Sequence, residues 1–422
     1  MGSGESPRGR GGARRGLCKM LCVEPGVFSG TFKAPPSKPI SQRLLLAGAL
    51  AEGETVVKGV ELSDDVVAML RAIQPLARIS IYGGDVHVER REPDVYRAFN
   101  VMESGFTLRT AVAVYAGVPG LTAVYYGGTL RGRPIDELIQ ALRSLTDVAK
   151  APGAVFIRGK RLSRFEVEMR ADISSQFISG LMFLAAAGEG GVVRPVGGRK
   201  SWSFVEATAS VLKQFGARVE VGDVIEVEGG LRGPGEVAVP GDYSLAAFLI
   251  AAGLITGGRV EVEGQASDVD KQVLDIFAAM GAHVAYDGRR ATAWGTPSRG
   301  VDVDLGSNPD LVMPVALVAA FVEDWTVIRG VEHLRYKESD RVASVLDVLQ
   351  RLGVEATYKD GALHIRGPPR RRNVQFLSHG DHRIGLMALA ASKAVGGCLD
   401  DVSPISKSWP TAPLYFIVLP EK

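Results

Sequence analysis

The sequence predicts an α/β protein made of two globules, each with apolar helices inside and β-sheets outside, that face each other across a cleft. The main observation is a six-fold internal repeat of about 70 residues, in which each copy reads as strand, helix, strand, helix, strand, strand. The copies begin near Ala34, Phe99, Met169, Ala238, Val303 and Val374. The second observation is that the first helix of a copy is almost wholly apolar, as in Phe177–Ala187 and Ala246–Leu254, and must therefore be buried on all sides. This recurring apolar helix argues against the alternative, a single doubly wound sheet.

The remaining elements of each copy follow from local patterns. The second helices are amphipathic, and we expect them at Asp136–Leu145, Asp268–Met280 and Ser339–Leu352. A strand pair follows the helix, because Gly or Ala closes the helix and alternating residues then flank a Gly-containing turn. This tail recurs at Gln214–Glu228, Ala279–Trp294 and Arg351–Arg366, and more loosely at Pro75–Glu89 and Thr146–Arg158.

Composition limits the class of protein. The 422 residues include 49 Lys and Arg against 47 Asp and Glu, a formal charge of +2, so overall charge favours neither a nucleic-acid nor a membrane partner. Apolar residues make up 46%, which excludes general disorder, and no apolar run reaches the ~18 residues that span a bilayer. The Gly- and Arg-rich start, Met1 to Gly16, lacks the apolar segment of a secretory signal, so we expect a cytoplasmic protein. Cys18, Cys22 and Cys398 make an odd count, from which we expect no disulfide framework.

Polar residues collect where each buried helix begins. Helix N-termini present unpaired N–H groups and the positive end of the helix dipole, so Ser, Asp and Asn are ordinary caps there. Capping does not explain Lys38, Gln176 or Arg383, because the dipole disfavours a cation unless an anion lies between them. The six loops contain Ser37-Lys38, Glu103-Ser104-Gly105, Ser174-Ser175-Gln176, Asp242-Tyr243-Ser244, Asn308-Pro309-Asp310 and Asp381-His382-Arg383.

The loops before the second helices are also rich in charge. Repeat-equivalent loops supply at least seven cations, and since the whole chain is nearly neutral, this excess is local. It predicts a small partner with several anionic groups, such as phosphate and carboxylate. Asp310 and Glu338 lie among the cations as available proton carriers, or alternatively as salt-bridge partners. The cations are Lys38, Arg43, Arg133, Lys337, Arg341, Arg383 and Lys407.

Other chemistries find little support. The sequence has one His-x-x-His, His379 to His382, but neither HExxH nor CxxC, so we expect no metal. No Walker loop and no GxGxxG opens a helix after a strand, and Gly-x-Ser-x-Gly is absent.

Five motifs, taken in order, resemble the 5-enolpyruvylshikimate-3-phosphate (EPSP) synthase family, also called 3-phosphoshikimate 1-carboxyvinyltransferases. They are Pro36–Arg43, Ser174–Gln176, Lys337–Arg341, Asp381–Arg383 and Ser406–Pro410. The resemblance runs from about Met20 to the end of the chain. It implies two inside-out α/β barrel domains of three units each. The domains would be 37–237, on the shikimate 3-phosphate side, and 20–36 plus 238–422, on the phosphoenolpyruvate side, with 1–19 as a disordered basic tail.

The resemblance also implies an activity and a site. The family transfers the enolpyruvyl group of phosphoenolpyruvate to the 5-hydroxyl of shikimate 3-phosphate, on the way to chorismate and aromatic amino acids, with no metal or organic cofactor. We expect a monomer. Asp310 would accept the hydroxyl proton, and Glu338 would help to protonate the enol methylene, with Lys38 and Lys407 as rival donors and His382 in support. Shikimate 3-phosphate would be held by Lys38, Arg43, Ser174, Ser175, Gln176, Ser201, Asp310 and Lys337, and phosphoenolpyruvate by Lys38, Gly105, Arg133, Gln176, Arg341, Arg383 and Lys407.

This sequence departs from the family pattern at five positions near the expected site. Pro39 stands where Ser is usual, Glu103 where Asn is common, and Phe106 where a small Thr is common. Phe204 replaces a common Tyr and His333 a common Asn. These changes leave the expected anion-binding cations intact and bear on the affinity for shikimate 3-phosphate. The bulk of Phe106 beside Gly105 also suggests altered access for glyphosate, the family's inhibitor at the phosphoenolpyruvate site.

Two other families of protein share features with this sequence. The sister transferase acts on UDP-N-acetylglucosamine and uses a Cys or Asp on a mobile loop, whereas Leu130–Arg133 carries neither. An RNA-binding protein, or a relative of the RNA 3′-phosphate cyclases that share this repeat, is suggested by the Arg-rich tail. Balanced charge and the lack of an RNA motif argue against it.

Overall fold

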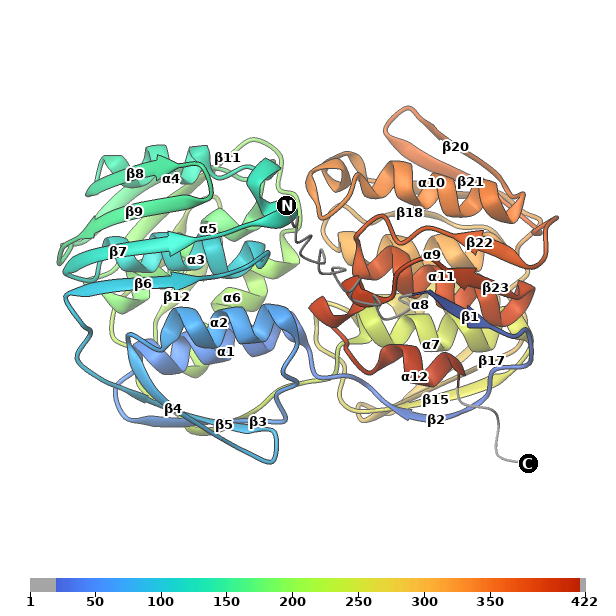
Figure 1. Cartoon of the computed structure of the whole chain (residues 1–422), viewed down its shortest axis with the longest axis horizontal. Helices are drawn as coiled ribbons and strands as arrows, with labels where there is room; N and C mark the ends of the chain where they lie inside the picture. The colour runs from blue at the N-terminus through green and yellow to red at the C-terminus, as the bar shows by residue number, and fades with distance from the viewer. Residues whose placement is uncertain (1–19, 418–422) are drawn as a thin grey trace, which may run out of the picture.

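Two lobes of helices wrapped by sheets lie side by side in the computed structural model, which describes residues 20–417 (Figure 1). The predicted tail 1–19 lies outside the described residues.

The first lobe is built from the first three repeats. The first contains β2 (Gly30–Lys33), α1 (Lys38–Leu50), β3 (Glu54–Lys58), α2 (Asp64–Ile73), β4 (Ala77–Tyr82) and β5 (Asp85–Arg90). The second contains β6 (Tyr96–Asn100), α3 (Gly105–Ala116), β7 (Gly120–Tyr125), the 3₁₀ turn η1 (Gly128–Gly132), α4 (Asp136–Arg143), β8 (Asp147–Ala151) and β9 (Ala154–Gly159). The third contains β10 (Phe165–Arg170), α5 (Ser175–Ala187), β11 (Gly191–Val196), α6 (Ser203–Gln214), β12 (Val219–Val221) and β13 (Ile225–Val227).

The second lobe repeats this order with the last three copies. The fourth copy contains β14 (Gly235–Ala238), α7 (Tyr243–Thr256), β15 (Arg259–Glu263), α8 (Gln272–Ala279), β16 (His283–Tyr286) and β17 (Arg290–Trp294). The fifth contains β18 (Asp302–Asp304), η2 (Pro309–Leu311), α9 (Val312–Ala319), β19 (Thr326–Arg329), η3 (Glu332–Tyr336), α10 (Arg341–Leu352), β20 (Glu355–Lys359) and β21 (Ala362–Arg366). The sixth contains β22 (Val374–Phe376), α11 (His382–Val395), β23 (Gly397–Leu399), η4 (Ser403–Lys407) and α12 (Ala412–Ile417). The predicted amphipathic helix at Asp268–Met280 is shorter in the structure, because Ser267 Oγ donates to Asp270 Oδ2 (2.8 Å) in a turn before it.

The outer sheets confirm the predicted repeat unit. In the second copy the strands are ordered β6-β7-β9-β8, with β6 parallel to β7 and the other neighbours antiparallel. The third and fifth copies have the same order, β10-β11-β13-β12 and β18-β19-β21-β20. Each of these three units thus forms one four-stranded sheet whose inner face packs on helices.

The first and fourth copies exchange their first strands. β14 pairs with β3, and β2 pairs with β15, both in parallel. The chain therefore passes between the lobes twice, and the two passages are bonded to each other. Ser37 N donates to Pro240 O (2.8 Å) and Asp242 N donates to Pro35 O (2.7 Å).

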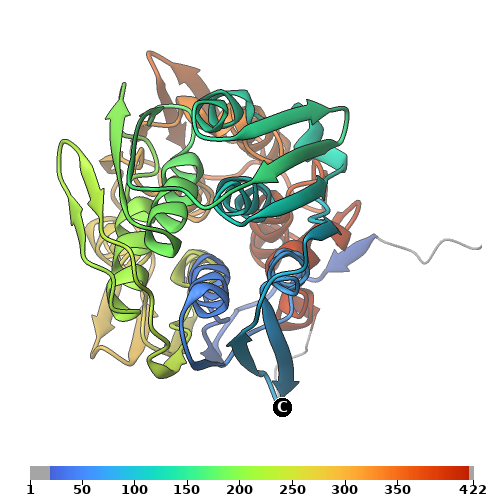
Figure 2. The ribbon, with the colours of Figure 1, turned by 90° about the vertical axis from the view of Figure 1, so that its left-hand side faces the viewer.

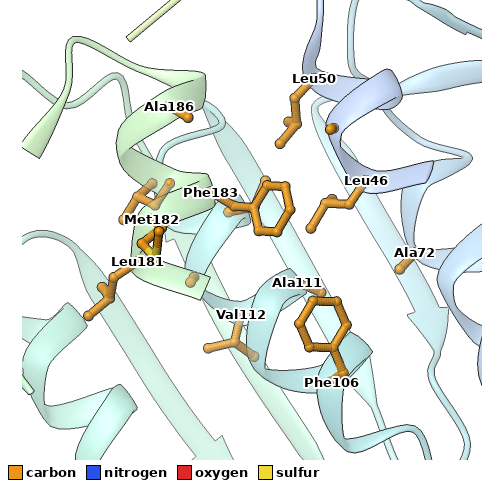
Figure 3. Packing of buried hydrophobic residues seen from close by; sticks show 14 of the residues in the cluster. Leu46, Leu50, Ala72, Phe106, Ala111, Val112, Leu181, Met182, Phe183 and Ala186 are labelled. Carbon is orange, nitrogen blue, oxygen red and sulfur yellow. The ribbon is translucent and has the colours of Figure 1, made fainter. Parts of the chain in front are cut away.

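Two separate apolar cores fill the lobes. In the first, α1, α3 and α5 lie inside the sheets, and Leu46, Val112 and Phe183 are among the residues that meet between them (Figures 2 and 3). In the second, α7, α9 and α11 have the same place. The prediction of apolar helices inside and sheets outside is confirmed. The division into 37–237 and 20–36 plus 238–422 stays a proposal, which the two cores support.

The sixth copy lacks the strand pair that follows the second helix in the others. Its sheet, β1-β23-β22, takes β1 (Leu21–Val23) from the start of the chain. In this pairing Cys22 lies opposite Cys398, and the two form a disulfide. The expectation of no disulfide framework was therefore wrong. An odd count does not prevent one pair, and a separation of 376 residues leaves no local signal of it.

We predict that Cys22→Ser lowers the free energy of unfolding by about 2–5 kcal/mol under oxidising conditions, since the disulfide restricts the unfolded chain over a very long loop. Chemical denaturation with and without reductant measures this, and reduction should remove the difference from the wild type. Thiol titration of the unfolded, unreduced chain should find one thiol of the three cysteines. Three thiols before reduction would contradict the bond.

Within residues 20–417, no helix is long and apolar enough to cross a membrane.

Candidate active site

A polar cleft lies where the first turns of the inner helices of both lobes meet. Its lining includes seven cations and three carboxylates, a formal local charge of +4 against +2 for the whole chain. Fourteen of the fifteen predicted site residues line this cleft, and the fifteenth, Lys407, contacts one of them: its Nζ lies 3.4 Å from Glu338 Oε1. The fourteen are Lys38, Arg43, Gly105, Arg133, Ser174, Ser175, Gln176, Ser201, Asp310, Lys337, Glu338, Arg341, His382 and Arg383. The structure thus brings together residues that lie up to 369 positions apart, from Lys38 to Lys407 (407 − 38).

Hydrogen bonds join the lobes at two places next to predicted site residues. At one, Ser201 N donates to Gly306 O (2.8 Å), and Ser203 Oγ donates to Ser307 O (2.7 Å). At the other, Ser406 Oγ donates to Asp64 Oδ2 (2.5 Å), one residue before Lys407.

Arg341 is the centre of the ionic network in the second lobe. It is the first residue of α10 and is only 2% exposed. Its guanidinium reaches Asp310 Oδ1 and Glu338 Oε2, both at 2.9 Å, and Asp381 Oδ2 at 2.7 Å. One arginine thereby holds three carboxylates from three loops in fixed positions.

Asp310 lies between two arginines. Arg383 Nη2 is 2.9 Å from its Oδ2 and also donates to Ser244 Oγ (3.0 Å). Burial by itself would raise the pKa of Asp310, but Arg383 and Arg341 outweigh it and lower that pKa to about 2. Asp310 is therefore a carboxylate at neutral pH, able to accept a proton.

Glu338 connects the lobes. Its Oε1 lies 3.5 Å from Arg133 Nη1 of the first lobe and 3.4 Å from Lys407 Nζ of the second. Burial opposes ionisation, yet Lys407, Arg341 and Arg133 together hold the pKa of Glu338 well below its ordinary value. In this state Glu338 carries no proton to donate, and the nearest ammonium is that of Lys407.

Lys38, the first residue of α1, also has a carboxylate partner. Its Nζ lies 3.0 Å from Asp65 Oδ2 at the start of α2. His382 is 1% exposed, and burial followed by the charge of Lys38 lowers its pKa well below the ordinary value, so its ring is neutral. Neither ring nitrogen forms a hydrogen bond among the described residues, although Nδ1 lies 3.6 Å from Asp381 Oδ1.

Two of the three cations predicted for shikimate 3-phosphate differ from Lys38, because Arg43 and Lys337 form no ion pair with a carboxylate anywhere in residues 20–417. Burial lowers the pKa of Arg43 to about 9 and, with a smaller opposing effect from Asp310, that of Lys337 to about 8. Both remain charged at neutral pH. A buried arginine and a half-buried lysine, neither of them paired with a carboxylate, are a signature of a site for an anion.

Ser174, Ser175 and Gln176 begin α5 on the same side of the cleft. Ser174 Oγ caps the helix by accepting from Gln176 N (3.3 Å), so the capping interpretation holds for this serine. Gln176 Oε1 accepts from Arg109 Nη1 (2.6 Å), which turns its amide NH₂ toward other partners. Ser201 has a φ of +53°, and its Oγ lies 3.3 Å from His333 Nε2 of the other lobe.

Sequence reasoning missed Asp65 and Arg109. Asp65 resembled an ordinary first-turn acid, and only its 3.0 Å contact with Lys38 distinguishes it. Arg109 did carry a signal: it is a cation inside an otherwise apolar helix, one turn after Gly105. Its donors bind Gln176 and the carbonyl of Pro134, next to Arg133.

Comparison with known proteins identifies this arrangement. A profile of the family described as EPSP synthase (3-phosphoshikimate 1-carboxyvinyltransferase) matches residues 23–413. The chain belongs to the EPSP synthase family. Proteins named 3-phosphoshikimate 1-carboxyvinyltransferase are 38% identical in Aeropyrum pernix, over 88% of this chain and 88% of that one, and 34% identical in Korarchaeum cryptofilum, over 93% and 96%. The resemblance drawn from the five motifs is therefore confirmed.

Solved structures of an EPSP synthase and of another enolpyruvyl transferase have the same fold as this chain. An EPSP synthase from Acinetobacter baumannii matches with a TM-score of 0.77 at 24% identity, over 94% of this chain and 97% of that one. The enolpyruvyl transferase NikO from Streptomyces tendae matches with a TM-score of 0.73 at 17% identity, over 94% and 96%. The inside-out arrangement of two three-unit domains is thus that of EPSP synthases. UDP-N-acetylglucosamine transfer and RNA binding are not favoured.

Proposed function

We propose that this cleft carries out the reaction of the EPSP synthase family with the residue roles given below. The chain is an enolpyruvyl transferase of the shikimate pathway, and its substrates are phosphoenolpyruvate and shikimate 3-phosphate. The observation that carries the assignment of roles is the convergence of cations from both lobes on one cleft with a net charge of +4. Two substrates that each bear a phosphate and a carboxylate match such a site.

The reaction is an addition followed by an elimination. The 5-hydroxyl oxygen attacks C2 of phosphoenolpyruvate, a proton is added at C3, and the hydroxyl proton is lost. The tetrahedral intermediate then loses phosphate from C2 and a proton from C3, which restores the double bond. One group must therefore supply a proton to C3, while another removes the proton from the hydroxyl oxygen that adds to C2. The phosphate and carboxylate stay anionic throughout, and fixed arginines and lysines stabilise them.

Asp310 is the proposed base. It is ionised, and Arg341 and Arg383 hold its two oxygens in place. Phosphoenolpyruvate would bind to Arg341 and Arg383, together with Arg133, Gly105 and Lys407. Its negative charge would weaken the attraction of Arg341 and Arg383 for Asp310 and so raise the pKa of Asp310.

The proton at C3 would come from a group near Glu338. Glu338 is itself ionised without ligand, so it either gains a proton as anions bind or holds Lys407 in position as the donor. Lys38 is the third candidate, and His382 supports this end of the site. Arg43, Ser174, Ser175, Gln176, Ser201 and Lys337 would hold shikimate 3-phosphate. We further propose that the enzyme is a cytoplasmic monomer that needs no metal or organic cofactor.

Release of phosphate from phosphoenolpyruvate tests the proposal directly. It should depend on shikimate 3-phosphate and should not occur with UDP-N-acetylglucosamine as the acceptor. Release with the nucleotide sugar alone would overturn it.

We also predict that kcat/KM for shikimate 3-phosphate falls as the pH rises through about 8, because Lys337 loses the charge that binds the anion. The sign follows from a lysine pKa that burial lowers: the ammonium is present below this pH and absent above it. The decrease should approach tenfold per pH unit. Lys337→Arg keeps the charge at this pH and should move the start of the decrease to about pH 9, where Arg43 loses its charge. A wild-type profile that is flat from pH 7 to 9.5 would contradict the prediction.

A further inference from the structure

Arg43 is held in the cleft without any carboxylate. It is 2% exposed, and three hydrogen bonds orient it: Nε donates to Thr208 Oγ1 (2.8 Å), Nη1 to Pro39 O (2.8 Å) and Nη2 to Phe204 O (3.1 Å). A guanidinium has five N–H groups. Three are used, so Nη1 and Nη2 each keep one N–H for a ligand.

Two aromatic rings lie against this guanidinium. Its central carbon, Cζ, is 4.3 Å from the ring centroid of Phe106 and 5.6 Å from that of Phe204. Phe106 is 6% exposed and lies at the start of α3, at the end of the apolar core (Figure 3). A desolvated cation on an aromatic face is stabilised by the ring quadrupole. Unlike a hydroxyl, the ring uses none of the N–H groups.

Gly105 and Phe106 are neighbours in sequence but face different cations. A Cβ on Gly105 would lie 2.7 Å from Arg109 Nη1 and 2.9 Å from Arg133 Nη1, so the missing side chain leaves room for the arginines of the phosphoenolpyruvate side. The Phe106 ring instead lies on Arg43. This contact supports the expectation that Phe106 bears on the affinity for shikimate 3-phosphate, and the expected effect on access for glyphosate stays untested.

We propose that Phe106 is a positioning residue for shikimate 3-phosphate: its ring holds the Arg43 guanidinium in the plane that presents two free N–H groups to an anionic group of that substrate. This inference rests on the proposed function. It makes Phe106, at a position where the family commonly has Thr, a determinant of affinity for shikimate 3-phosphate and not for phosphoenolpyruvate.

The test compares Phe106→Leu and Phe106→Met, which keep an apolar side chain without a ring, with Phe106→Tyr, which keeps the ring. We expect the Leu and Met variants to raise KM for shikimate 3-phosphate about tenfold, with KM for phosphoenolpyruvate and kcat within about twofold of the wild type. Phe106→Tyr should keep most of the wild-type affinity for shikimate 3-phosphate. Calorimetric titration with shikimate 3-phosphate alone should show the same order.

Other outcomes overturn the inference. An equal loss of affinity for both substrates, or a lower melting temperature with unchanged KM values, would mean that Phe106 only packs the core. A rise in KM for phosphoenolpyruvate alone would place it on the other side of the site. If wild-type enzyme releases no phosphate with shikimate 3-phosphate, the proposed function fails. If wild type turns over and the Leu and Met variants bind shikimate 3-phosphate normally, only this inference fails.

Discussion

Asp310→Asn should lower kcat by roughly 10²–10⁴, the usual contribution of a general base, while both substrates still bind. The amide has nearly the same shape as the carboxylate but cannot accept the 5-hydroxyl proton. Because Arg341 and Arg383 lose one negative partner each, phosphoenolpyruvate should bind as tightly as before or more tightly. Single-turnover kinetics with separate binding titrations would measure both effects.

Asp340→Asn is the matched control. Asp340 precedes Arg341 in the same loop, but its carboxylate caps α10 by accepting from Ala343 N (3.1 Å), and Asn caps equally well. We expect near-normal turnover from this variant. Glu338→Gln should also bind the substrates and turn over slowly. Near-normal turnover by Asp310→Asn and Glu338→Gln would show that their assigned roles are wrong.

Arg341→Met should destabilise the folded protein by about 3–5 kcal/mol at pH 7, because it leaves Asp310, Glu338 and Asp381 without their shared cation. Acid should reduce the loss. In the variant the pKa values of Asp310 and Glu338 rise, because Arg341 no longer lowers them, so protonation relieves the burial of these charges and the destabilisation present at pH 7 shrinks as the pH falls through those values. Urea unfolding at pH 7 and at pH 4 measures this difference.

Arg329→Met is the matched control for this experiment, because it removes an arginine whose ion pair has similar distances but is exposed to solvent. Arg329 forms a bidentate pair with Asp302 at 2.7 and 2.6 Å, but the two side chains are 54% and 55% exposed. Such a surface pair contributes at most about 1 kcal/mol. Equal destabilisation by Arg341→Met and Arg329→Met would mean that the buried network does not act as proposed.

The repeat and its inner helices were predictable, because burial leaves a direct trace in composition. A helix such as α7, buried on every side, must be apolar all round, and an amphipathic helix such as α10 cannot replace it. Charges at the start of such helices are also conspicuous, which is why Lys38 and Arg383 were found from the sequence. The names of substrates came only with the family resemblance.

The places where the structure departs from the repeat could not be predicted from the composition of single segments. Exchange of β2 and β14 between lobes, and the pairing of β1 with β23, depend on which edge a strand meets, and a strand's own residues look the same on either edge. The disulfide between Cys22 and Cys398 follows from that pairing.

The sequence by itself determined that this protein has two three-unit lobes and which cations gather at the helix starts, since buried surface and local charge are properties of neighbouring residues. Only the tertiary structure decided which cation keeps a carboxylate partner and which does not. Arg341 has three such partners and Arg43 has two aromatic rings instead, although both are arginines beside the same cleft. The difference lies in residues that approach from distant parts of the chain, and the burial of these side chains strengthens the effect of each contact on charge.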